Sequence, residues 1–551
     1  MMQTNYIQLD PNDNVLTALQ NLEAGAEIIY QNHIIKIREH IRAKHKFPIQ
    51  DFKTGDKVRM YGTVVGECTQ DIAAGALISQ ANIKHATQDY STQQSQFKWQ
   101  APDVSRWKDR TFKGFHRADG QVGTANYWIV IPLVFCENRN IKVMQASLLE
   151  ALGYPGEKEF SFDISQLIAL YQSGAEENAI FQSDILRKRN ESSQNRVFPN
   201  VDGIKFLTHE GGCGGTRQDA QSLCNLLAGY ITNPNVAGAT VLSLGCQHAQ
   251  IPILQAAIQA RDPQFAKPVY YLEQQNSKSE PEFIAEALKK TFIGLTQANT
   301  CQRKPAPLSK LVLGLECGGS DGFSGITANP VLGRVSDLLV ALGGSSILSE
   351  FPELNGVEQE LINRCARPDL AEKFSDLMRT YSERAVAVGS GFENNPSPGN
   401  IREGLITDAI KSAGAAKKGG TSPVKGVLDY TEPLTATGLN LLCTPGNDVE
   451  STTALAGSGA NIVVFTTGLG TPTGNPITPV VKMSSNSEIY ARMRDIIDFD
   501  AGTIVRGEST IEGKAEELLE YLIEVASGEE IPAAVRLGQD DFIPWKRGVS
   551  L

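Results

Sequence analysis

Short apolar runs separated by turn residues fill the first 82 residues of the chain. Runs such as Glu27-Ile-Ile-Tyr30, Lys57-Val-Arg-Met-Tyr61 and Thr63-Val-Val65 have the length of strands, and glycines lie between them. Runs of this length bounded by turn residues are typical of β-structure. We therefore predict a small β-rich domain over residues 1–85.

Residues 86–110 interrupt this pattern. They are polar, rich in Gln and Ser, and show no sustained apolar period. Such a composition is typical of a linker. Trp99 and Trp107 stand out in it, and we expect them to anchor the linker to a neighbouring part of the protein.

After residue 110, strand-like runs alternate with helical patterns. Four apolar runs end in Gly-rich or Cys-containing loops, namely residues 204–208, 240–244, 311–315 and 462–465. This alternation indicates mostly parallel sheets covered by helices, and open α/β folds bind ligands at the carboxyl ends of their strands. The predicted fold class is α/β, with the small β-rich domain followed by a central α/β domain (111–305) and a C-terminal α/β domain (306–551).

Three segments carry clear helix signals. Residues 279–298 and 513–526 show apolar stripes at helical spacing, and the second stops before Gly528. In the third, Asn329 is in position to cap a helix that has Pro330 in its first turn and ends near Gly343. The free N–H groups at the amino end of that helix could hold a carboxylate or phosphate.

Composition and charge exclude several classes of function. The 551 residues are 41% hydrophobic and carry a formal net charge of -11, without long runs of Lys or Arg, so nucleic acid is not an expected partner. Neither a secretory signal nor an apolar run of membrane-spanning length is present. Nine cysteines spread over a long chain do not suggest a disulfide framework. We predict a cytoplasmic protein that acts on a small molecule.

The densest group of chemically active residues lies at positions 316–330. Carboxylates and hydroxyls are spaced among glycines there, so that backbone amides can approach a polar ligand closely. The run is no P-loop, because no Lys follows the glycines. A purely structural loop is the alternative. The candidates are Glu316, Cys317, Ser320, Asp321, Ser324, Thr327 and Asn329.

A second group spans residues 208–217 and includes His209, Cys213 and Arg217. A His at a strand end is as often a hydrogen-bonded structural residue as a ligand or base. Cys246 follows the next strand, and Cys213, Cys246 and Cys317 lack the short spacing of iron–sulfur or zinc motifs. A metal cluster would have to be assembled from three separate strand ends.

Further polar loops follow along the chain, and each taken alone is typical of a solvated connection. Together they supply the hydroxyls, amides and cations that a polyhydroxylated acid requires. The candidates in these loops are Arg117, Asn126, Lys417, Lys418, Thr466 and Thr467.

The order of these segments resembles the altronate/galactarate dehydratases. The motifs that carry the resemblance are ECGGSDGFSGITANP, LSEFPELNGVEQEL, NPSPGN, KKGGTSPVKGVLDY and FTTGLGTPTG. The first 85 residues resemble the SAF-type domain that opens these enzymes, and His45-Lys46 match its Gly-His-Lys turn except that Lys44 replaces the Gly. The resemblance implies a metal-dependent hydro-lyase that forms homo-oligomers, with Fe²⁺ the expected ion and Mn²⁺ the alternative.

Two departures from the family pattern affect this expectation. Residues 75–82 hold none of the alternating histidines that close the family's opening domain, and Ala125 replaces an Arg. Plausible metal ligands and a cation for a substrate carboxylate are therefore missing. His45, His85, His116 and Arg117 are the candidates to compensate for them.

The resemblance also implies a reaction, the dehydration of D-altronate to a 2-keto-3-deoxy acid in hexuronate catabolism. A base removes the proton beside the carboxylate, an acid protonates the departing hydroxyl, and a divalent ion stabilises the enediolate. We predict the catalytic residues His209, Glu316, Asp321 and Glu350, with Glu353 as a further carboxylate. The predicted metal ligands are Cys213, Cys246, Cys317 and His45. The predicted substrate-binding residues are Arg117, Asn126, Arg217, Ser320, Ser324, Thr327, Asn329, Lys417, Lys418, Thr466 and Thr467.

Three alternatives remain open. The first is a related lyase that acts on galactarate or sulfolactate, and the second is a sugar-acid-binding protein without activity. The third is an iron–sulfur hydro-lyase. The dehydratase hypothesis requires that Cys213, Cys317 and Asp321 meet in one pocket.

Overall fold

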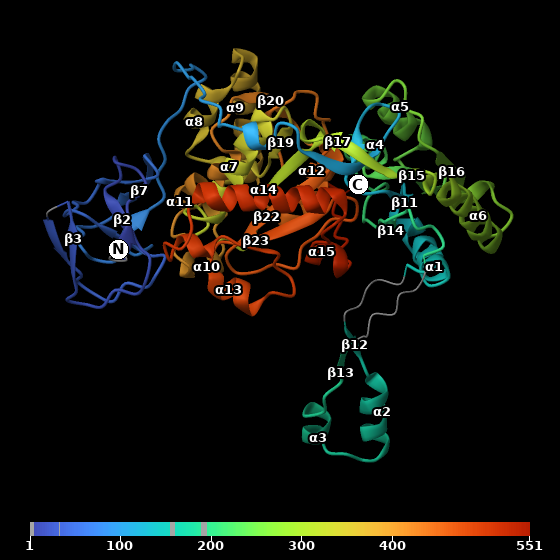
Figure 1. The fold of residues 1–551 in the computed structure, drawn as a ribbon, viewed down its shortest axis with the longest axis horizontal. Helices are drawn as coiled ribbons and strands as arrows, with labels where there is room; N and C mark the ends of the chain where they lie inside the picture. Colours follow the sequence, from blue (N-terminus) through green and yellow to red (C-terminus); the bar gives the residue numbers. More distant parts are fainter. Residues whose placement is uncertain (1–4, 32, 155–159, 189–195, 551) are drawn as a thin grey trace.

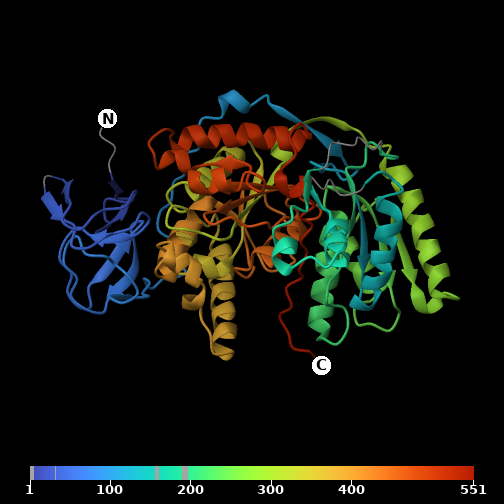
Figure 2. The ribbon, with the colours of Figure 1, turned by 90° about the horizontal axis from the view of Figure 1, so that it is seen from below.

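Three parts of the chain lie in a row in the computed structural model, which describes residues 5–31, 33–154, 160–188 and 196–550 (Figures 1 and 2). The N-terminal domain forms one end, the C-terminal residues fill the middle, and the α/β region that follows the linker forms the other end. A β-rich domain followed by parallel α/β sheets confirms the predicted fold class.

The N-terminal domain consists of short antiparallel strands in three small sheets, of order β1-β2-β5, β3-β4 and β6-β7-β8. Strands β3 and β4 turn one face inward, β2 and β5 are buried on both faces, and Leu16, Ile28, Ile35 and Phe47 share a core. The strands are β1 (Tyr6–Ile7), β2 (Val15–Ala18), β3 (Glu27–Tyr30), β4 (His33–Lys36), β5 (Lys46–Pro48), β6 (Lys57–Met60), β7 (Thr63–Cys68) and β8 (Ile83–Lys84).

The linker runs over the C-terminal domain, and its two tryptophans hold it there. The Trp107 indole is buried and donates a hydrogen bond to Glu520, and the Trp99 indole donates to Thr421. The predicted anchoring role of both residues is confirmed.

The central domain is built on a parallel sheet of order β14-β11-β15-β16. Side chains of β11 alternate, so that Ile129 and Ile131 face one core while Trp128 and Val130 face another. The sheet strands are β11 (Tyr127–Pro132), β14 (Gly203–Phe206), β15 (Val236–Ser243) and β16 (Val269–Glu273). The helices that cover them are α1 (Asn138–Leu149), α4 (Arg217–Thr232), α5 (Ile251–Arg261) and α6 (Glu280–Ala298).

An excursion between α1 and β14 carries β12 (Phe160–Phe162), α2 (Ile164–Gln172), α3 (Glu177–Phe181) and β13 (Leu186–Lys188), and lies apart from this sheet in Figure 1. A smaller antiparallel sheet, β10-β9-β17, joins the central domain to the C-terminal one. Its strands are β9 (Thr111–His116), β10 (Val122–Gly123) and β17 (Arg303–Pro307), and β17 crosses the boundary that we predict at residue 305.

The C-terminal domain holds a seven-stranded parallel sheet of order β20-β21-β19-β18-β22-β23-β24. Its strands are β18 (Val312–Cys317), β19 (Ser345–Leu348), β20 (Val424–Leu428), β21 (Leu439–Leu442), β22 (Ile462–Thr467), β23 (Val480–Ser484) and β24 (Phe499–Asp500). Its helices include α7 (Ala328–Ala341), α8 (Glu358–Arg364), α9 (Pro368–Ala387), α10 (Pro398–Arg402), α11 (Asp408–Ala415), α12 (Asp448–Ser458), α13 (Ser487–Arg492), α14 (Ile511–Ser527) and α15 (Ala533–Arg536).

The three predicted helices form, with one error at a helix start. Ser279, the first residue of the range predicted for a helix, caps α6, and Gly528 ends α14 in a left-handed conformation as predicted. The predicted cap at Asn329 is wrong, because α7 begins at Ala328 and the Asn329 side chain bonds Gly414 and Thr466 instead. Of the helices that the structure describes, none has the length and apolar character needed to cross a membrane.

Candidate active site

The carboxyl ends of the central strands of the seven-stranded sheet bring five ionisable side chains together. Cys317 is the last residue of β18, and Glu350 and Glu353 follow β19. Lys411 lies on α11, and Lys418 lies in the short turn after it. Parallel strands that end at one edge explain how residues so far apart in sequence meet.

These side chains are in direct contact. The Cys317 thiol donates to Glu353 Oε2 at 3.0 Å, and Lys418 Nζ donates to Cys317 Sγ at 2.8 Å and to Glu350 Oε2 at 2.7 Å. Lys411 Nζ lies 2.7 Å from Glu353 Oε1. Exposed fractions of 0% for Glu350 and 1% for Lys418 show that the site is closed to bulk water. Charges this deeply buried persist only when they are paired.

Glu350 is held in an unusual backbone conformation. Its φ of 68° lies in the left-handed region, and its N–H donates to Thr444 Oγ1 at 2.8 Å. A non-glycine residue in this region costs of order 1 kcal/mol and persists only when its surroundings hold it there. In this conformation Glu350 Oε2 accepts hydrogen bonds from the backbone N–H of Cys317 at 3.2 Å and from Lys418 Nζ at 2.7 Å.

Two buried carboxylate oxygens of the site have no hydrogen-bond partner. They are Oε1 of Glu350 and Oε1 of Glu316, the residue before Cys317. The other oxygen of Glu316 accepts from Ser349 Oγ at 2.9 Å and Ser451 Oγ at 2.7 Å. An unpartnered buried oxygen costs about 1–3 kcal/mol, so it points to a missing group.

Burial and mutual repulsion set the protonation of these groups. Burial, followed by the charge of Glu350, raises the pKa of Glu316 well above its ordinary value. Burial and Glu353 likewise raise the pKa of Glu350. Burial opposes ionisation of Glu353, but Lys411 and Lys418 outweigh it and lower its pKa. The site therefore combines a carboxylic acid that holds its proton with a carboxylate that stays charged.

The donor set fits a divalent cation. One ligand atom each from Cys317, Glu350 and Glu353 lies within 4.8 Å of the others, and among the described residues this is the single group of His, Cys, Asp and Glu that meets this spacing. The carboxyls of Glu316, Glu350, Glu353 and Asp448 outnumber the two lysine ammoniums, which leaves an excess of acidic groups. Burial raises the pKa of the Cys317 thiol well above its ordinary value, so the thiol would lose its proton only on binding the ion, and with the two carboxylates it would then hold Fe²⁺ or Mn²⁺.

Asp448, the first residue of α12, lies on the rim of the site. It is half-buried, and a Cβ at Gly318 would lie 2.1 Å from its Oδ2, so a larger residue at 318 would force the Asp448 side chain to move. Burial, followed by the charges of Glu350 and Glu353, raises the pKa of Asp448 to about 7. This value suits a group that exchanges a proton at neutral pH.

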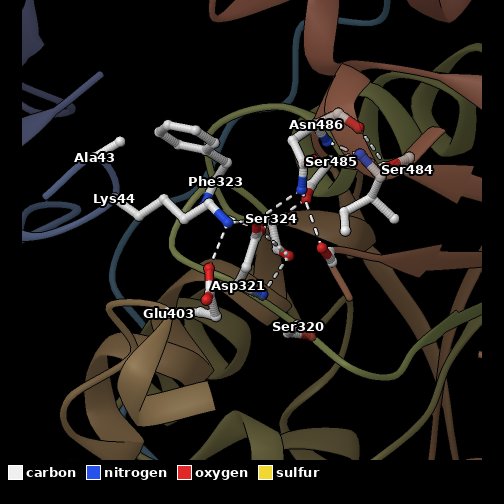
Figure 3. Close-up of polar contacts among 12 residues, drawn as sticks. Ala43, Lys44, Ser320, Asp321, Phe323, Ser324, Glu403, Ser484, Ser485 and Asn486 are labelled. Atoms are coloured by element: carbon white, nitrogen blue, oxygen red, sulfur yellow. Dashed lines mark hydrogen bonds and ion pairs between the residues drawn. The ribbon is translucent and has the colours of Figure 1, made fainter. Parts of the chain in front are cut away.

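Asp321 belongs to a different cluster, shown in Figure 3. Its carboxylate is 0% exposed and accepts five donors. Oδ1 accepts from Phe323 N (3.1 Å), Ser324 Oγ (3.0 Å) and Ser485 Oγ (2.7 Å), and Oδ2 accepts from Asn486 Nδ2 and Lys44 Nζ (3.0 Å each). Every lone-pair direction is therefore used by the protein itself.

Lys44 links this cluster to the N-terminal domain. It adopts a left-handed φ of 75°, and its ammonium also pairs with Glu403 at 2.5 Å. Lys46 is 1% exposed and donates to the carbonyls of Lys44 and Gly404, and burial lowers its pKa to about 7. The two lysines fix the N-terminal domain to the segment that carries Asp321.

A cavity with a volume of about 350 Å³ lies between the central domain and residues of the C-terminal domain. His209 lines it, but both ring nitrogens are engaged, since Nε2 donates to Pro132 O at 2.8 Å and Nδ1 accepts from Gly211 N at 3.0 Å. Burial lowers the pKa of His209 to about 4, so the ring is neutral at pH 7. Cys213 also lines this cavity, together with Phe542 and Trp545 near the C-terminus.

The predicted metal ligands are distributed over separate places. Cys317 lies in the buried C-terminal site, whereas Cys213 and Cys246 are exposed at the end of the other parallel sheet. His45 lies in the N-terminal domain, where its Nδ1 is 3.2 Å from Ala43 O. The expectation that Cys213, Cys317 and Asp321 share one pocket is wrong, because the strands that precede them belong to two different sheets and Asp321 faces Lys44.

Most of the predicted substrate-binding residues use their polar groups within the protein. Asn329, Thr466, Thr327 and Ser324 form buried hydrogen bonds around the loop from 316 to 329. Lys418 alone among them contacts the Cys317 site. The others have different partners. The backbone oxygen of Ser320 accepts from Asn400, and Thr467 Oγ1 accepts from Gly470 N. Lys417 pairs with Glu360, Arg117 donates to Asn126 and Pro234, and Arg217 is exposed at the start of α4.

Sequence reasoning missed several residues of these clusters, among them Lys411, Asp448 and Lys44. Lys411 lies within a helix of small residues and shows no motif of its own. Asp448 is the last residue of the polar loop 444–448 and the first of α12. This position at a helix start was the sequence signal that could have indicated a functional role. Lys44 showed itself only as the residue that replaces a glycine in the His45-Lys46 turn.

Comparisons with known proteins match all three parts of the chain. Three family models match: the Altronate/galactarate dehydratase SAF domain at residues 4–86, the second domain of D-galactarate dehydratase/Altronate hydrolase at 114–299, and the C-terminal D-galactarate/Altronate dehydratase domain at 308–550. An altronate dehydratase of Bacillus subtilis is 34% identical over 99% of both chains. An altronate dehydratase of Escherichia coli is 33% identical over 95% of this chain and 96% of its own. A galactarate dehydratase (L-threo-forming) of Escherichia coli is 29% identical over 96% of this chain and 92% of its own.

Proposed function

The chain belongs to the altronate and galactarate dehydratase family, and from this premise we propose that it is a metal-dependent hydro-lyase whose substrate is D-altronate. The product would be a 2-keto-3-deoxy acid, formed in hexuronate catabolism. Two of the relatives compared are altronate dehydratases that match nearly the full length of the chain. We keep the cytoplasm as the proposed location and a homo-oligomer as the proposed assembly.

We place the reaction at the Cys317 site. Cys317, Glu350 and Glu353 would hold the divalent ion, with Fe²⁺ favoured and Mn²⁺ as the alternative. When bound, the ion would act as a Lewis acid on the substrate carboxylate and an adjacent hydroxyl. The unpartnered Oε1 of Glu350 and the excess of carboxyl groups support this assignment.

The protein's own residues would then bind the substrate and move protons. Lys411 and Lys418, which pair with Glu353 and Glu350 in this structure, are the proposed cations for the sugar-acid carboxylate. Asp448 at the rim is the proposed base for the proton beside that carboxylate. Glu316 is the proposed acid for the departing hydroxyl, since burial keeps its proton in place.

One observation carries the proposal: a thiol and two carboxylates meet two lysines at the ends of parallel strands, out of contact with water. Sealed sites of this kind strengthen every electrostatic interaction inside them.

The test is an anaerobic assay of the full chain with Fe²⁺ or Mn²⁺ against D-altronate, galactarate and sulfolactate. We expect 2-keto-3-deoxy product from D-altronate, abolished in Glu350→Gln and retained in Glu383→Gln, a matched control on the exposed face of α9. Turnover of galactarate or sulfolactate alone would instead assign the chain to that substrate. Sugar-acid binding without turnover under any metal would overturn the proposal in favour of a binding protein.

A further inference from the structure

Three cysteines of the central domain lie at the same end of its parallel sheet. Cys136 follows β11, Cys213 follows β14 and Cys246 follows β15. The strand order places β11 between β14 and β15, and neighbouring strands lie about 4.8 Å apart. The three loops therefore leave the sheet side by side.

Hydrogen bonds tie these loops to one another. Phe135 N donates to Gly211 O at 3.1 Å, and His248 N donates to Gly212 O at 3.0 Å. Each bond joins backbone one or two residues away from a cysteine. Each of the three cysteines is thus held near the others by backbone that is already ordered.

Glycines beside two of the cysteines allow the loops to follow their observed paths. Gly212 has a φ of 98°, and a Cβ there would lie 2.0 Å from Leu133 O, so only glycine lets the Cys213 loop lie against the end of β11. Gly245 has a φ of 124° directly before Cys246. His209 adds a further link, because its ring spans from Pro132 to Gly211.

Exposure separates these cysteines from the other six. Cys136, Cys213 and Cys246 are the three exposed thiols of the chain, whereas five others are buried and Cys301 is intermediate. Free cysteines are usually buried, and an exposed thiol is open to oxidation. Three exposed thiols on three adjoining loops are best explained by a common ligand.

We propose that Cys136, Cys213 and Cys246 hold an iron–sulfur cluster through three thiolates, with the fourth coordination position left to a non-protein ligand. Each thiol loses its proton when it binds iron. A site for a single ion needs ligand atoms within 4.8 Å of one another, and among the described residues no such group includes these three sulfurs. A polynuclear cluster, which spans a larger distance, therefore suits them better than one ion. The cavity of about 350 Å³ adjoins Cys213 and gives room for the outer ligand.

This site is distinct from the Cys317 site and from the function proposed for it. It also changes the iron–sulfur alternative drawn from the sequence, since Cys136 takes the place of Cys317 as the third ligand. Loop spacing alone does not reveal this grouping, because 77 residues separate Cys136 from Cys213 and only the order of strands in the sheet brings them together.

The test is anaerobic reconstitution of the full chain with ferrous iron, sulfide and a thiol reductant, read by iron content, acid-labile sulfide and visible absorption. We expect about four irons and four sulfides per chain in the wild type, with loss of both in Cys136→Ser, Cys213→Ser and Cys246→Ser. Cys317→Ser and Cys301→Ser are the matched controls and should keep the full content. None of these readouts depends on turnover, so the proposed function can fail while this site stands.

Several outcomes would overturn the inference. The wild type could fail to take up iron stably, or it could take up iron or zinc without sulfide. Full cluster content in any one of the three serine variants would also contradict the inference. Because a variant could lose its cluster by unfolding, circular dichroism of each apoprotein accompanies the measurement. A folded variant without a cluster supports the site, and where one is unfolded, the corresponding Cys→Ala variant replaces it.

Discussion

Two buried clusters of the C-terminal domain, around Glu350 and around Asp321, use the same residue types in opposite ways. Each has a carboxylate that is fully buried and paired with a lysine. Asp321 accepts five donors, whereas Glu350 keeps one oxygen without a partner and sits on a strained backbone. Saturation of a buried carboxylate indicates a structural role, and an unpartnered oxygen indicates a place for a ligand.

The largest loss of activity is expected for a substitution at Glu350, and its absence would contradict the comparison. Glu350→Gln keeps the shape but removes a charged ligand, so we expect turnover with Fe²⁺ or Mn²⁺ to fall by about 10⁴-fold. The measurement is the initial rate of 2-keto-3-deoxy acid formation under anaerobic conditions. A variant that keeps a tenth or more of the wild-type rate would contradict the assignment.

Asp321→Asn should act on stability rather than on chemistry. The change leaves Lys44 with Glu403 alone and removes the buried charge that accepts five hydrogen bonds, which costs about 3 kcal/mol in the free energy of unfolding. Urea denaturation followed by tryptophan fluorescence measures this loss. We expect the folded variant to retain its rate within about tenfold, and a folded, stable but inactive Asp321→Asn would instead return Asp321 to the catalytic residues.

His209 gives a stability effect with a defined pH dependence. Its pKa is about 4 in the folded protein against an ordinary 6.5, so between these values the unfolded chain binds more protons. The stabilisation is fully present above pH 6.5 and is lost as the pH falls towards 4, by about 3 kcal/mol in all. Urea unfolding at pH 7 and pH 5 should show a smaller difference in His209→Gln than in the wild type, and an equal difference in both would refute the prediction.

The smallest effect is expected at Lys44. Lys44→Gly removes the ion pairs with Asp321 and Glu403 but also relieves the left-handed backbone, so the net loss in stability should be about 1–2 kcal/mol. Lys44→Met removes the same charge and keeps the strain. We expect limited proteolysis to release the N-terminal domain faster in Lys44→Met than in Lys44→Gly, and the reverse order would contradict this account.

Local signals made much of the fold predictable. The helical pattern that starts at Ser279 and the Gly528 stop marked two helix ends. The apolar runs that end at residues 208, 244, 315 and 465 marked strands of parallel sheets. Asn329 misled the prediction because its side chain was needed for a tertiary contact with Thr466 rather than for a cap. Propensity at a helix end yields to packing when the residue is fully buried.

The candidate sites were predictable only in part. Glu316, Cys317 and Glu350 stand out because they follow strands in Gly-rich or acidic motifs. The pairing of Lys411 with Glu353 depends on how α11 packs against the sheet, which no local pattern reveals. The expectation of one pocket failed because strand tips were assigned to a single sheet, whereas β14 and β18 belong to different ones.

The most direct test of the comparison is Mn²⁺ binding, measured by electron paramagnetic resonance on the full chain and on two matched variants. We predict one tightly bound Mn²⁺ in the wild type and in Asp321→Asn, and its loss in Glu350→Gln. Mn²⁺ prefers oxygen ligands, so it should bind at the carboxylates of Glu350 and Glu353 in preference to the three exposed thiols. Loss of binding in Asp321→Asn with retention in Glu350→Gln would show that the saturated cluster, and not the Cys317 site, holds the metal.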